Sequence, residues 1–296
     1  DAAEKLRGEA RYVGDMSVPN MLWGKVLRST VPHARITRLD AHAALARPGV
    51  VTVLTGDDTL DIDPYWGHAI KDRPIVAIDV VRFQGEPVAA VAAVDEATAQ
   101  AALDDIIVEY EELPIVGTID DALAPDAQLV HEGEIRPGLF HGLGVLPPRD
   151  GNICYSYAID RGDTAAIFAT ADIVVEGEYE FPGVYQYAME THTVIAAWEG
   201  DEVTLHATCQ HPFLVRAEIA ALFGIPLGKV RIIVPYLGGG FGSKSYTKIE
   251  PLTGDQARHI GRYGESMIRA YNRGKRSIAL DLKSEAGCEA ALRLIA

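Results

Sequence analysis

The chain alternates short apolar runs with turns rich in Gly, Pro and Asp, a pattern that predicts several strands and a few short helices. Residues 50–55 and 87–94 are strand candidates, and the second run does not alternate, which predicts a strand buried on both faces. Asp95 can cap a helix over residues 96–104, because its carboxylate can accept from the free N–H groups of the first turn. Residues 106–110 return as a strand, so this part is expected to be mixed α and β.

A second unit is expected after residues 117–151, where Pro, Gly and Asp are scattered without periodicity, as in a connector. It opens with a strand candidate at 173–181, followed by an alternating strand at 202–208. A helix that stops at Gly224 and a strand at 230–236 come next. The expected buried faces are Val203, Leu205 and Ala207 on the alternating strand, and Val215, Ile219, Leu222 and Phe223 on the helix.

Composition and charge narrow the class of protein. With 296 residues, 48% hydrophobic and 23% charged, the chain matches soluble globular averages, and no apolar run approaches the ~18 residues of a membrane span. The net charge of −15 argues against nucleic acid or an anionic membrane surface as the general partner. Cys154, Cys209 and Cys288 lack the paired spacings of zinc or iron–sulfur sites, so no metal ligands are assigned and each is expected to be a small buried hydrophobe. A cytoplasmic location is expected.

The last segment differs in charge from the rest. Residues 251–296 carry eight Lys or Arg against five Asp or Glu, whereas the chain as a whole is strongly acidic. Such a reversal marks a compositional boundary. Within this tail, residues 276–282 are expected to form a strand and residues 284–295 a helix.

The segment with the most specific chemistry is Gly238-Gly239-Gly240-Phe241-Gly242-Ser243-Lys244, which follows the strand candidate at 230–236. Glycine permits positive φ and lets the backbone come within hydrogen-bonding distance of a ligand. Successive N–H groups of such a loop can form a concavity for an anionic or oxo group. By itself the loop has two interpretations, a cofactor loop or a glycine-rich turn between strands.

Two groups of motifs stand in order along the chain. The first comprises Gly8-Glu9-Ala10-Arg11-Tyr12, Gly24-Lys25-Val26-Leu27-Arg28-Ser29 and Val81-Arg82-Phe83-Gln84-Gly85-Glu86-Pro87-Val88. The second comprises Gly151-Asn152-Ile153-Cys154, Arg161-Gly162-Asp163, Met189-Glu190-Thr191-His192 and the glycine loop. In this order they resemble the molybdenum-binding large subunit of the xanthine dehydrogenase and aldehyde oxidase family.

The resemblance implies an α+β fold in four parts. Residues 1–118 would form a hammerhead α/β domain, 119–150 a connector, and 151–250 the first part of a mixed α/β molybdopterin-binding domain, which is thus truncated. Residues 251–296 would form a short βα tail of different origin.

The resemblance also implies a cofactor, a molybdopterin in the cytosine dinucleotide form that is common in bacterial members. Gln210 corresponds to the glutamine beside the molybdenum oxo ligand, where an amide donates without adding charge. The loop whose backbone lies at the metal corresponds to Gly239, Gly240, Phe241 and Gly242. Partner subunits would carry the 2Fe-2S clusters and FAD.

Catalytic residues are not assigned. In the family a glutamate takes the proton during hydroxylation, and it belongs to the second half of the cofactor domain, which this sequence is expected to lack. Glu190 and His192 are expected to point the same way on a strand and could form an acid–base pair or a hydrogen-bonded structural pair, and structural support is favoured. Purine-oxidising members commonly carry Glu directly after the loop lysine, where Ser245 stands here, which disfavours xanthine as the substrate.

The tail has a resemblance of its own. Gly254-Asp255-Gln256-Ala257-Arg258 and the stretch from Asn272 to Lys283 resemble the N-terminal part of a family III coenzyme A transferase, in which a basic cluster approaches coenzyme A. A solvated basic turn is the alternative. The transferase's catalytic aspartate lies beyond this stretch in its family.

Three functions are therefore open. The favoured hypothesis is a truncated molybdenum hydroxylase large subunit, an oxidoreductase that hydroxylates a carbon of an aldehyde or N-heterocycle with water as the oxygen source, inactive as an isolated chain. The alternatives are a coenzyme A transferase fragment and a non-catalytic binding module in which the hammerhead domain folds alone.

Overall fold

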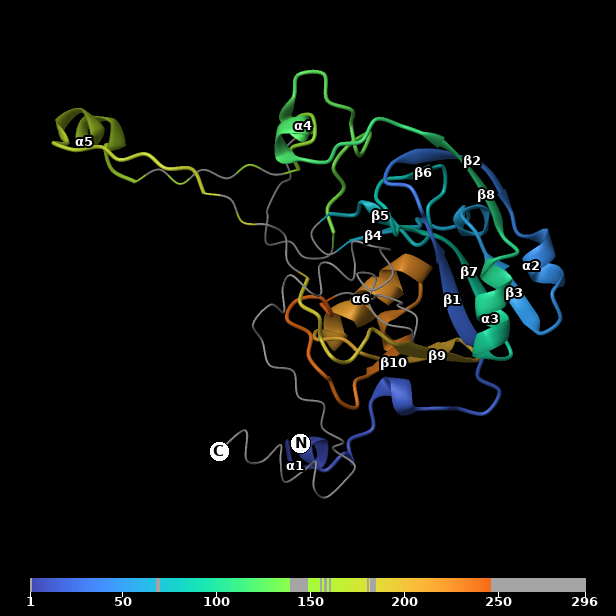
Figure 1. Ribbon diagram of the computed structural model, residues 1–296. Helices are drawn as coiled ribbons and strands as arrows, with labels where there is room; N and C mark the ends of the chain where they lie inside the picture. The colour runs from blue at the N-terminus through green and yellow to red at the C-terminus, as the bar shows by residue number, and fades with distance from the viewer. Residues whose placement is uncertain are drawn as a thin grey trace.

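The computed structural model describes residues 2–67, 70–138 and 149–245, apart from positions 155, 157, 158, 160, 180 and 182–184 (Figure 1). The chain is mixed α and β, as predicted: an N-terminal part built on two small sheets is followed by a second part with a three-stranded sheet. The tail expected at 251–296 lies outside the described residues.

The N-terminal part is built on two small antiparallel sheets. In the first, β7 (Pro87–Ala93) lies between β1 (Trp23–Arg28) and β3 (Val50–Leu54). In the second, β2 (Ala34–Asp40) lies between β6 (Val80–Val81) and β8 (Ile107–Glu112). The apolar run at 87–94 is thus a central strand, and the buried side chains of Val88, Ala89, Val91 and Ala93 confirm its expected burial.

Helix α3 (Glu96–Leu103) covers β1 and β7 and buries Ala99 and Ala102. Its cap is the predicted one, because Oδ1 of Asp95 accepts the N–H of Thr98 at 2.7 Å. The shorter elements of this part are α1 (Ala2–Leu6), η1 (Val13–Asp15), α2 (His42–Ala46), η2 (Asp57–Thr59), the hairpin of β4 (Tyr65–Trp66) and β5 (Arg73–Pro74), and α4 (Ile119–Leu123).

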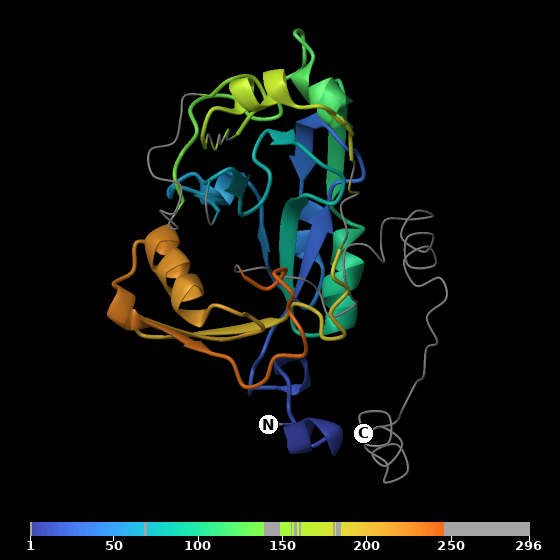
Figure 2. The same cartoon turned by 90° about the vertical axis from the view of Figure 1, so that its left-hand side faces the viewer.

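The second part contains a strand–helix–strand unit. Strand β10 (Glu202–Ala207) pairs in parallel with β11 (Val230–Ile233) and antiparallel with β9 (Val194–Glu199). Helix α6 (Pro212–Phe223) connects the two parallel strands, packs beside β11 (Figure 2) and ends at Gly224, whose φ of 63° suits glycine. A short turn, η4 (Leu227–Lys229), precedes β11. Strand, helix, strand and loop follow in the predicted order.

The buried faces of this unit are largely those predicted. Val203, Leu205 and Ala207 of β10 pack with Val215 and Ile219 of α6. Two helical positions differ: Leu222 is only partly buried and Phe223 is 46% exposed, and both line a cavity instead of packing into this core.

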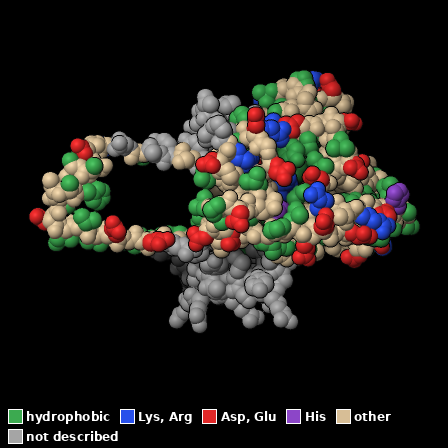
Figure 3. All heavy atoms as spheres, turned by 90° about the horizontal axis from the view of Figure 1, so that it is seen from above, with side chains coloured by type: hydrophobic (Ala, Val, Ile, Leu, Met, Phe, Trp, Pro, Cys, Tyr) green, Lys and Arg blue, Asp and Glu red, His purple; other side chains and the backbone are tan. Residues whose placement is uncertain are grey.

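The strand predicted at 173–181 is wrong: residues 173–179 carry no regular secondary structure. They follow α5 (Thr164–Thr170) in a segment that extends far from the body of the molecule (Figures 1 and 3). A strand needs a neighbour to satisfy its N–H and C=O groups, and the described residues provide none here.

The connector expected at 119–150 contains α4 and otherwise irregular chain in its described part. Among the described residues, no helix combines the length and apolar character that crossing a bilayer needs.

Candidate functional site

The glycine loop leaves β11 and lies against the turn that precedes β9. Oε2 of Glu190 accepts the N–H of Gly238 at 2.7 Å. A side chain at Gly238 would bring its Cβ within 2.5 Å of Cβ of Glu190, so the close approach requires glycine.

Gln210 lies between the end of β10 and the start of α6, and it joins this end of the sheet to the loop. Its backbone N–H donates to the carbonyl oxygen of Lys244 at 2.7 Å, and its side-chain Oε1 accepts the N–H of Gly242 at 2.9 Å. A Cβ atom at Gly240 would lie 2.5 Å from both Cδ and Oε1 of Gln210. The missing side chain at Gly240 therefore makes room for the amide.

The backbone of the loop is bent into the left-handed region at three positions. Gly239 has φ of 97° and Gly242 has φ of 93°, and Phe241 between them has φ of 49°, which is uncommon for a residue with a side chain. This bend leaves Phe241 exposed. Gln210, Gly239, Gly240, Phe241 and Gly242 are thereby brought together.

Several donors at this loop are unused. Among the described residues, no hydrogen bond is made by the N–H groups of Gly239, Gly240 and Phe241, or by Nε2 of Gln210. Neighbouring N–H groups of this kind are suited to an anion or an oxo group. The arrangement fits the oxo-bearing end of a molybdenum cofactor, because it offers hydrogen bonds without a full charge.

A buried ion pair lies beneath the loop. Nζ of Lys244 is 2.7 Å from Oε2 of Glu190, the same oxygen that accepts from Gly238. Lys244 is fully buried and the Glu190 side chain is 10% exposed. Through its Oε2 atom, Glu190 thus contacts both ends of the loop, Gly238 and Lys244. Because a buried charge without a partner costs several kcal/mol, loss of either member of the pair is expected to destabilise the loop.

His192 holds the loop from the same turn. Its Nε2 lies 3.1 Å from the carbonyl oxygen of Ser243, and the Ser243 hydroxyl donates to the carbonyl oxygen of Gly240 at 2.7 Å. The structural interpretation of Glu190 and His192 is confirmed, because both anchor the loop. Their placement on a strand is wrong, since both precede β9.

The N-terminal segment also reaches this site, which the sequence analysis missed. The Tyr236 hydroxyl donates to Oε2 of Glu4 at 2.7 Å, and this bond raises the pKa of Tyr236. The ring of Tyr12 lies 6.0 Å from that of Tyr236, centroid to centroid, and Cε1 of Tyr12 would be 3.3 Å from a Cβ at Gly238. More than 200 residues separate these partners in sequence, so no local pattern could have revealed the contact.

Cys209 lies directly before Gln210 but is buried in the apolar core of the second unit. Burial raises the pKa of its thiol to about 11. The residue is therefore a structural hydrophobe at neutral pH, as predicted. Cys154 differs, because it is exposed, and Cys288 lies outside the described residues.

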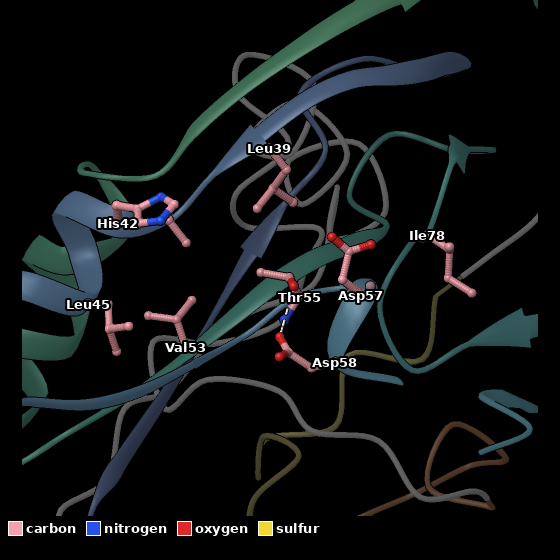
Figure 4. Close-up of a pocket in the computed structure, with 10 residues that line it drawn as sticks. Leu39, His42, Leu45, Val53, Thr55, Asp57, Asp58 and Ile78 are labelled. Atoms are coloured by element: carbon pink, nitrogen blue, oxygen red, sulfur yellow. Dashed lines mark hydrogen bonds between the residues drawn. The ribbon is translucent and has the colours of Figure 1, made fainter. Parts of the chain in front are cut away.

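Two cavities lie elsewhere in the described part of the chain. One, of about 280 Å³, is lined by residues that include His42, Thr55, Asp57 and Asp58, and Figure 4 shows the Asp58 carboxylate turned back to Thr55. The other, of about 500 Å³, lies between the N-terminal sheets and α6. No loop residue lines either cavity. The described residues contain no cluster of His, Cys, Asp and Glu suited to a metal ion.

Comparison with known families agrees with this arrangement. Residues 7–114 match the aldehyde oxidase and xanthine dehydrogenase a/b hammerhead domain, and residues 146–269 match the molybdopterin cofactor-binding domain. Residues 246–296 match CoA-transferase family III, which overlaps the end of the preceding match.

Individual relatives cover most of the chain. It is 37% identical over 263 residues to a probable xanthine dehydrogenase subunit of Bacillus subtilis strain 168, which is 88% of this chain and 33% of that protein. It is 36% identical over 249 residues to the carbon monoxide dehydrogenase large chain of Hydrogenophaga pseudoflava, which is 82% of this chain and 30% of that protein.

A crystal structure of quinoline 2-oxidoreductase from Pseudomonas putida 86 matches with a TM-score of 0.69 and 32% identity over 82% of this chain and 30% of that one. The chain thus spans about a third of the length of each of these three relatives. With its hammerhead domain and the partial cofactor-binding domain that carries the glycine loop, this chain belongs to the xanthine dehydrogenase and aldehyde oxidase family and corresponds to part of the molybdopterin-binding large subunit.

Proposed function

We propose that the glycine loop and Gln210 form one wall of a molybdopterin site. The chain would then be the first part of an oxidoreductase that hydroxylates a carbon of an aldehyde or N-heterocycle, with water as the oxygen source. The observation that carries the proposal is the bond from the Gly242 N–H to Oε1 of Gln210, which leaves Nε2 as a donor beside the unused N–H groups of the loop.

Each residue has a defined task in this proposal. The molybdenum pterin supplies the two-electron redox chemistry when bound. Nε2 of Gln210 donates to an oxo group as a neutral amide, so it adds no charge at the centre. The N–H groups of Gly239, Gly240 and Phe241 bind the same end of the cofactor, and Gly242 orients the Gln210 amide.

The finer assignments rest on the family. We infer the cytosine dinucleotide form of the cofactor, partner subunits with 2Fe-2S clusters and FAD, and a small-molecule substrate. We infer that the chain alone does not turn over substrate, because the glutamate that takes the proton in the family belongs to the part of the large subunit beyond the region matched here. The boundaries at 118, 150 and 250 stay predictions.

The cofactor site can be tested with two matched glycine variants. The chain would be produced in a host that synthesises the cofactor, and molybdenum and pterin would be measured per chain after purification. Gly240→Ala would push Gln210 aside and lower pterin retention about tenfold, the effect of ~1.4 kcal/mol in binding. Gly228→Ala, whose new Cβ meets nothing within 4 Å, would leave it unchanged.

Two results would contradict the proposal: no pterin in the wild-type chain, or equal retention in both variants. Oxidation of an aldehyde by the purified chain would contradict the inferred inactivity, but it would not contradict the proposed cofactor site.

The match of residues 246–296 to CoA-transferase family III favours a second candidate, coenzyme A binding by the tail. A ligand that binds only the folded state raises the melting temperature. A rise with coenzyme A that disappears when residues 251–296 are removed would support this candidate, and an unchanged melting temperature would reject it.

A further inference from the structure

The N-terminal segment, residues 2–16, folds back on itself and lies against the second unit. Helix α1 is followed by a turn at Gly8, whose φ of 68° suits glycine. In this turn the N–H groups of Glu9 and Ala10 donate to the carbonyl oxygen of Glu4 at 2.9 and 3.3 Å. Val13 of η1 is fully buried, and η1 contacts β9. Figures 1 and 2 both show the segment beside the sheet that contains β9 and β10.

Tyr236, which precedes the glycine loop, is contacted by three residues of this segment. Its hydroxyl donates to Oε2 of Glu4 at 2.7 Å, and its ring lies 6.0 Å from that of Tyr12, centroid to centroid. Nζ of Lys5 lies 6.0 Å from the centroid of the same ring, at the outer limit of a cation–π contact. Because Tyr236 is two residues from Gly238, these contacts restrict the backbone where it enters the loop.

Gly238, the first residue of the loop, lies between the N-terminal segment and the turn before β9. Its N–H donates to Oε2 of Glu190 at 2.7 Å, and its carbonyl oxygen accepts the N–H of Glu190 at 3.4 Å. A Cβ atom at this position would lie 2.5 Å from Cβ of Glu190 and 3.3 Å from Cε1 of Tyr12. The space left by the missing side chain is thus bounded by Glu190 and by the Tyr12 ring.

The loop needs anchors at both ends because its backbone is strained. A residue with a side chain in the left-handed region, such as Phe241 at φ of 49°, keeps that conformation only where its surroundings fix it. The far end is fixed inside the second unit, where the N–H of Gln210 donates to the carbonyl oxygen of Lys244 at 2.7 Å. At the near end, Gly238 is held between Glu190 and the N-terminal segment. The near end therefore depends on a part of the chain that is distant in sequence.

We propose that Tyr12 and Glu4 are positioning residues for the glycine loop, so that docking of the N-terminal segment and binding of the cofactor favour each other. They act through Tyr236 and Gly238, which set the path of the backbone into the loop. The effect on the cofactor rests on the proposed molybdopterin site, whereas the effect on the loop is measurable without a ligand. Because coupling between two sites is reciprocal, a cofactor at the loop also holds the N-terminal segment more firmly.

The first test measures hydrogen exchange in the full 296-residue chain without cofactor. Tyr12→Ala removes the ring beside Gly238 and should speed exchange of the Gly238 and Gly242 amides about tenfold, because the loop opens more easily. Tyr12→Phe keeps the ring and should exchange like the wild type. The β10 amides report unfolding of the whole second unit, and their exchange should change little in either variant.

Two exposed glutamates of the segment provide matched variants. Glu4→Ala removes the acceptor of the Tyr236 hydroxyl and should speed exchange at Gly238 about threefold, the effect of one hydrogen bond near the surface. Glu4→Gln keeps an oxygen that can accept, so it should restore the wild-type rate. Glu9→Ala is the control, because the Glu9 carboxylate pairs with Arg7 at 2.9 Å at the surface, and it should leave exchange at Gly238 unchanged.

The second test measures pterin per chain after production in a host that synthesises the cofactor. Tyr12→Ala should lower pterin retention about tenfold, matching its effect on the loop, and Tyr12→Phe should restore it. In the reciprocal direction, exchange of the Glu9 and Ala10 amides should be slower in the wild-type chain with cofactor than without it.

Three results would overturn the proposal. The first is unchanged exchange at Gly238 in Tyr12→Ala. The second is equal acceleration at the loop and at β10, which would show that Tyr12 supports only the fold as a whole. The third is wild-type pterin retention in a Tyr12→Ala chain whose loop exchange is accelerated. Absence of pterin from the wild type would instead overturn the proposed cofactor site, and the exchange rates would still decide whether Tyr12 positions the loop.

Discussion

The ion pair beneath the glycine loop predicts a large and strongly coupled effect on stability. Lys244→Met leaves the Glu190 carboxylate, only 10% exposed, without its cation, and Glu190→Gln leaves the fully buried Lys244 ammonium without its anion. Breaking a buried pair from one side costs about 3–5 kcal/mol. We expect Lys244→Met at the lower end, because Glu190 keeps the N–H of Gly238.

The double variant should cost much less than the sum of the two. With Met at 244 and Gln at 190 no buried charge remains, and the amide oxygen can still accept from Gly238. A coupling free energy of about 2–3 kcal/mol between the two positions follows.

Hydrogen exchange of the β10 amides measures these free energies, because this central strand opens only when the second unit unfolds. Lys229→Met is the matched control: its Nζ pairs with Asp201 and Glu202 at the surface, so the variant should change stability little. Additive single effects, or a Lys244→Met variant as mild as Lys229→Met, would refute the role given to the pair.

Three further predictions concern single residues. At pH 8 an alkylating reagent should modify the exposed Cys154 and spare Cys209, because a pKa of about 11 keeps Cys209 a thiol. Mass spectrometry of the peptides measures the extent of modification at each cysteine, and equal modification of both would contradict the burial of Cys209. Burial raises the pKa of Glu86, so the folded state binds this proton more tightly than the unfolded state, and the resulting stabilisation is lost as the pH rises from the unfolded-state pKa through the folded-state pKa. In urea unfolding, the free energy of unfolding of Glu86→Gln should therefore increase relative to that of the wild type between about pH 4 and pH 7. A difference that stays constant over this range would contradict the raised pKa. Asp95→Ala removes the cap of α3 and should speed exchange of the Thr98 amide roughly fivefold to tenfold, whereas an unchanged rate would show that the cap is dispensable.

Local patterns predicted the elements whose partners lie nearby in the chain. The non-alternating run at 87–94 identified the central strand β7, and the alternation at 202–208 identified β10. Asp95 and Gly224 marked a helix start and a helix end, because capping depends on groups within one turn.

The errors concern features that depend on distant partners. The alternation at 173–181 is typical of a strand, yet no described neighbour completes its ladder. The bond from Tyr236 to Glu4 joins opposite ends of the described chain, and no spacing rule relates them. Gln210 was assigned to the site by resemblance, and its bond to Gly242 became visible only once the sheet had brought the two together.

The most direct test of the proposed cofactor site is the nuclear magnetic resonance spectrum of the chain during titration with molybdopterin. We predict that the side-chain amide of Gln210 and the backbone amides of Gly239, Gly240 and Phe241 shift together and saturate at one equivalent. The side-chain amide of Asn152, whose Nδ2 donates to carbonyl oxygens of the connector, should stay unchanged as an internal reference. Shifts that map elsewhere, or a Gln210 amide that remains unchanged at saturating cofactor, would contradict the assignment of this loop as the cofactor wall.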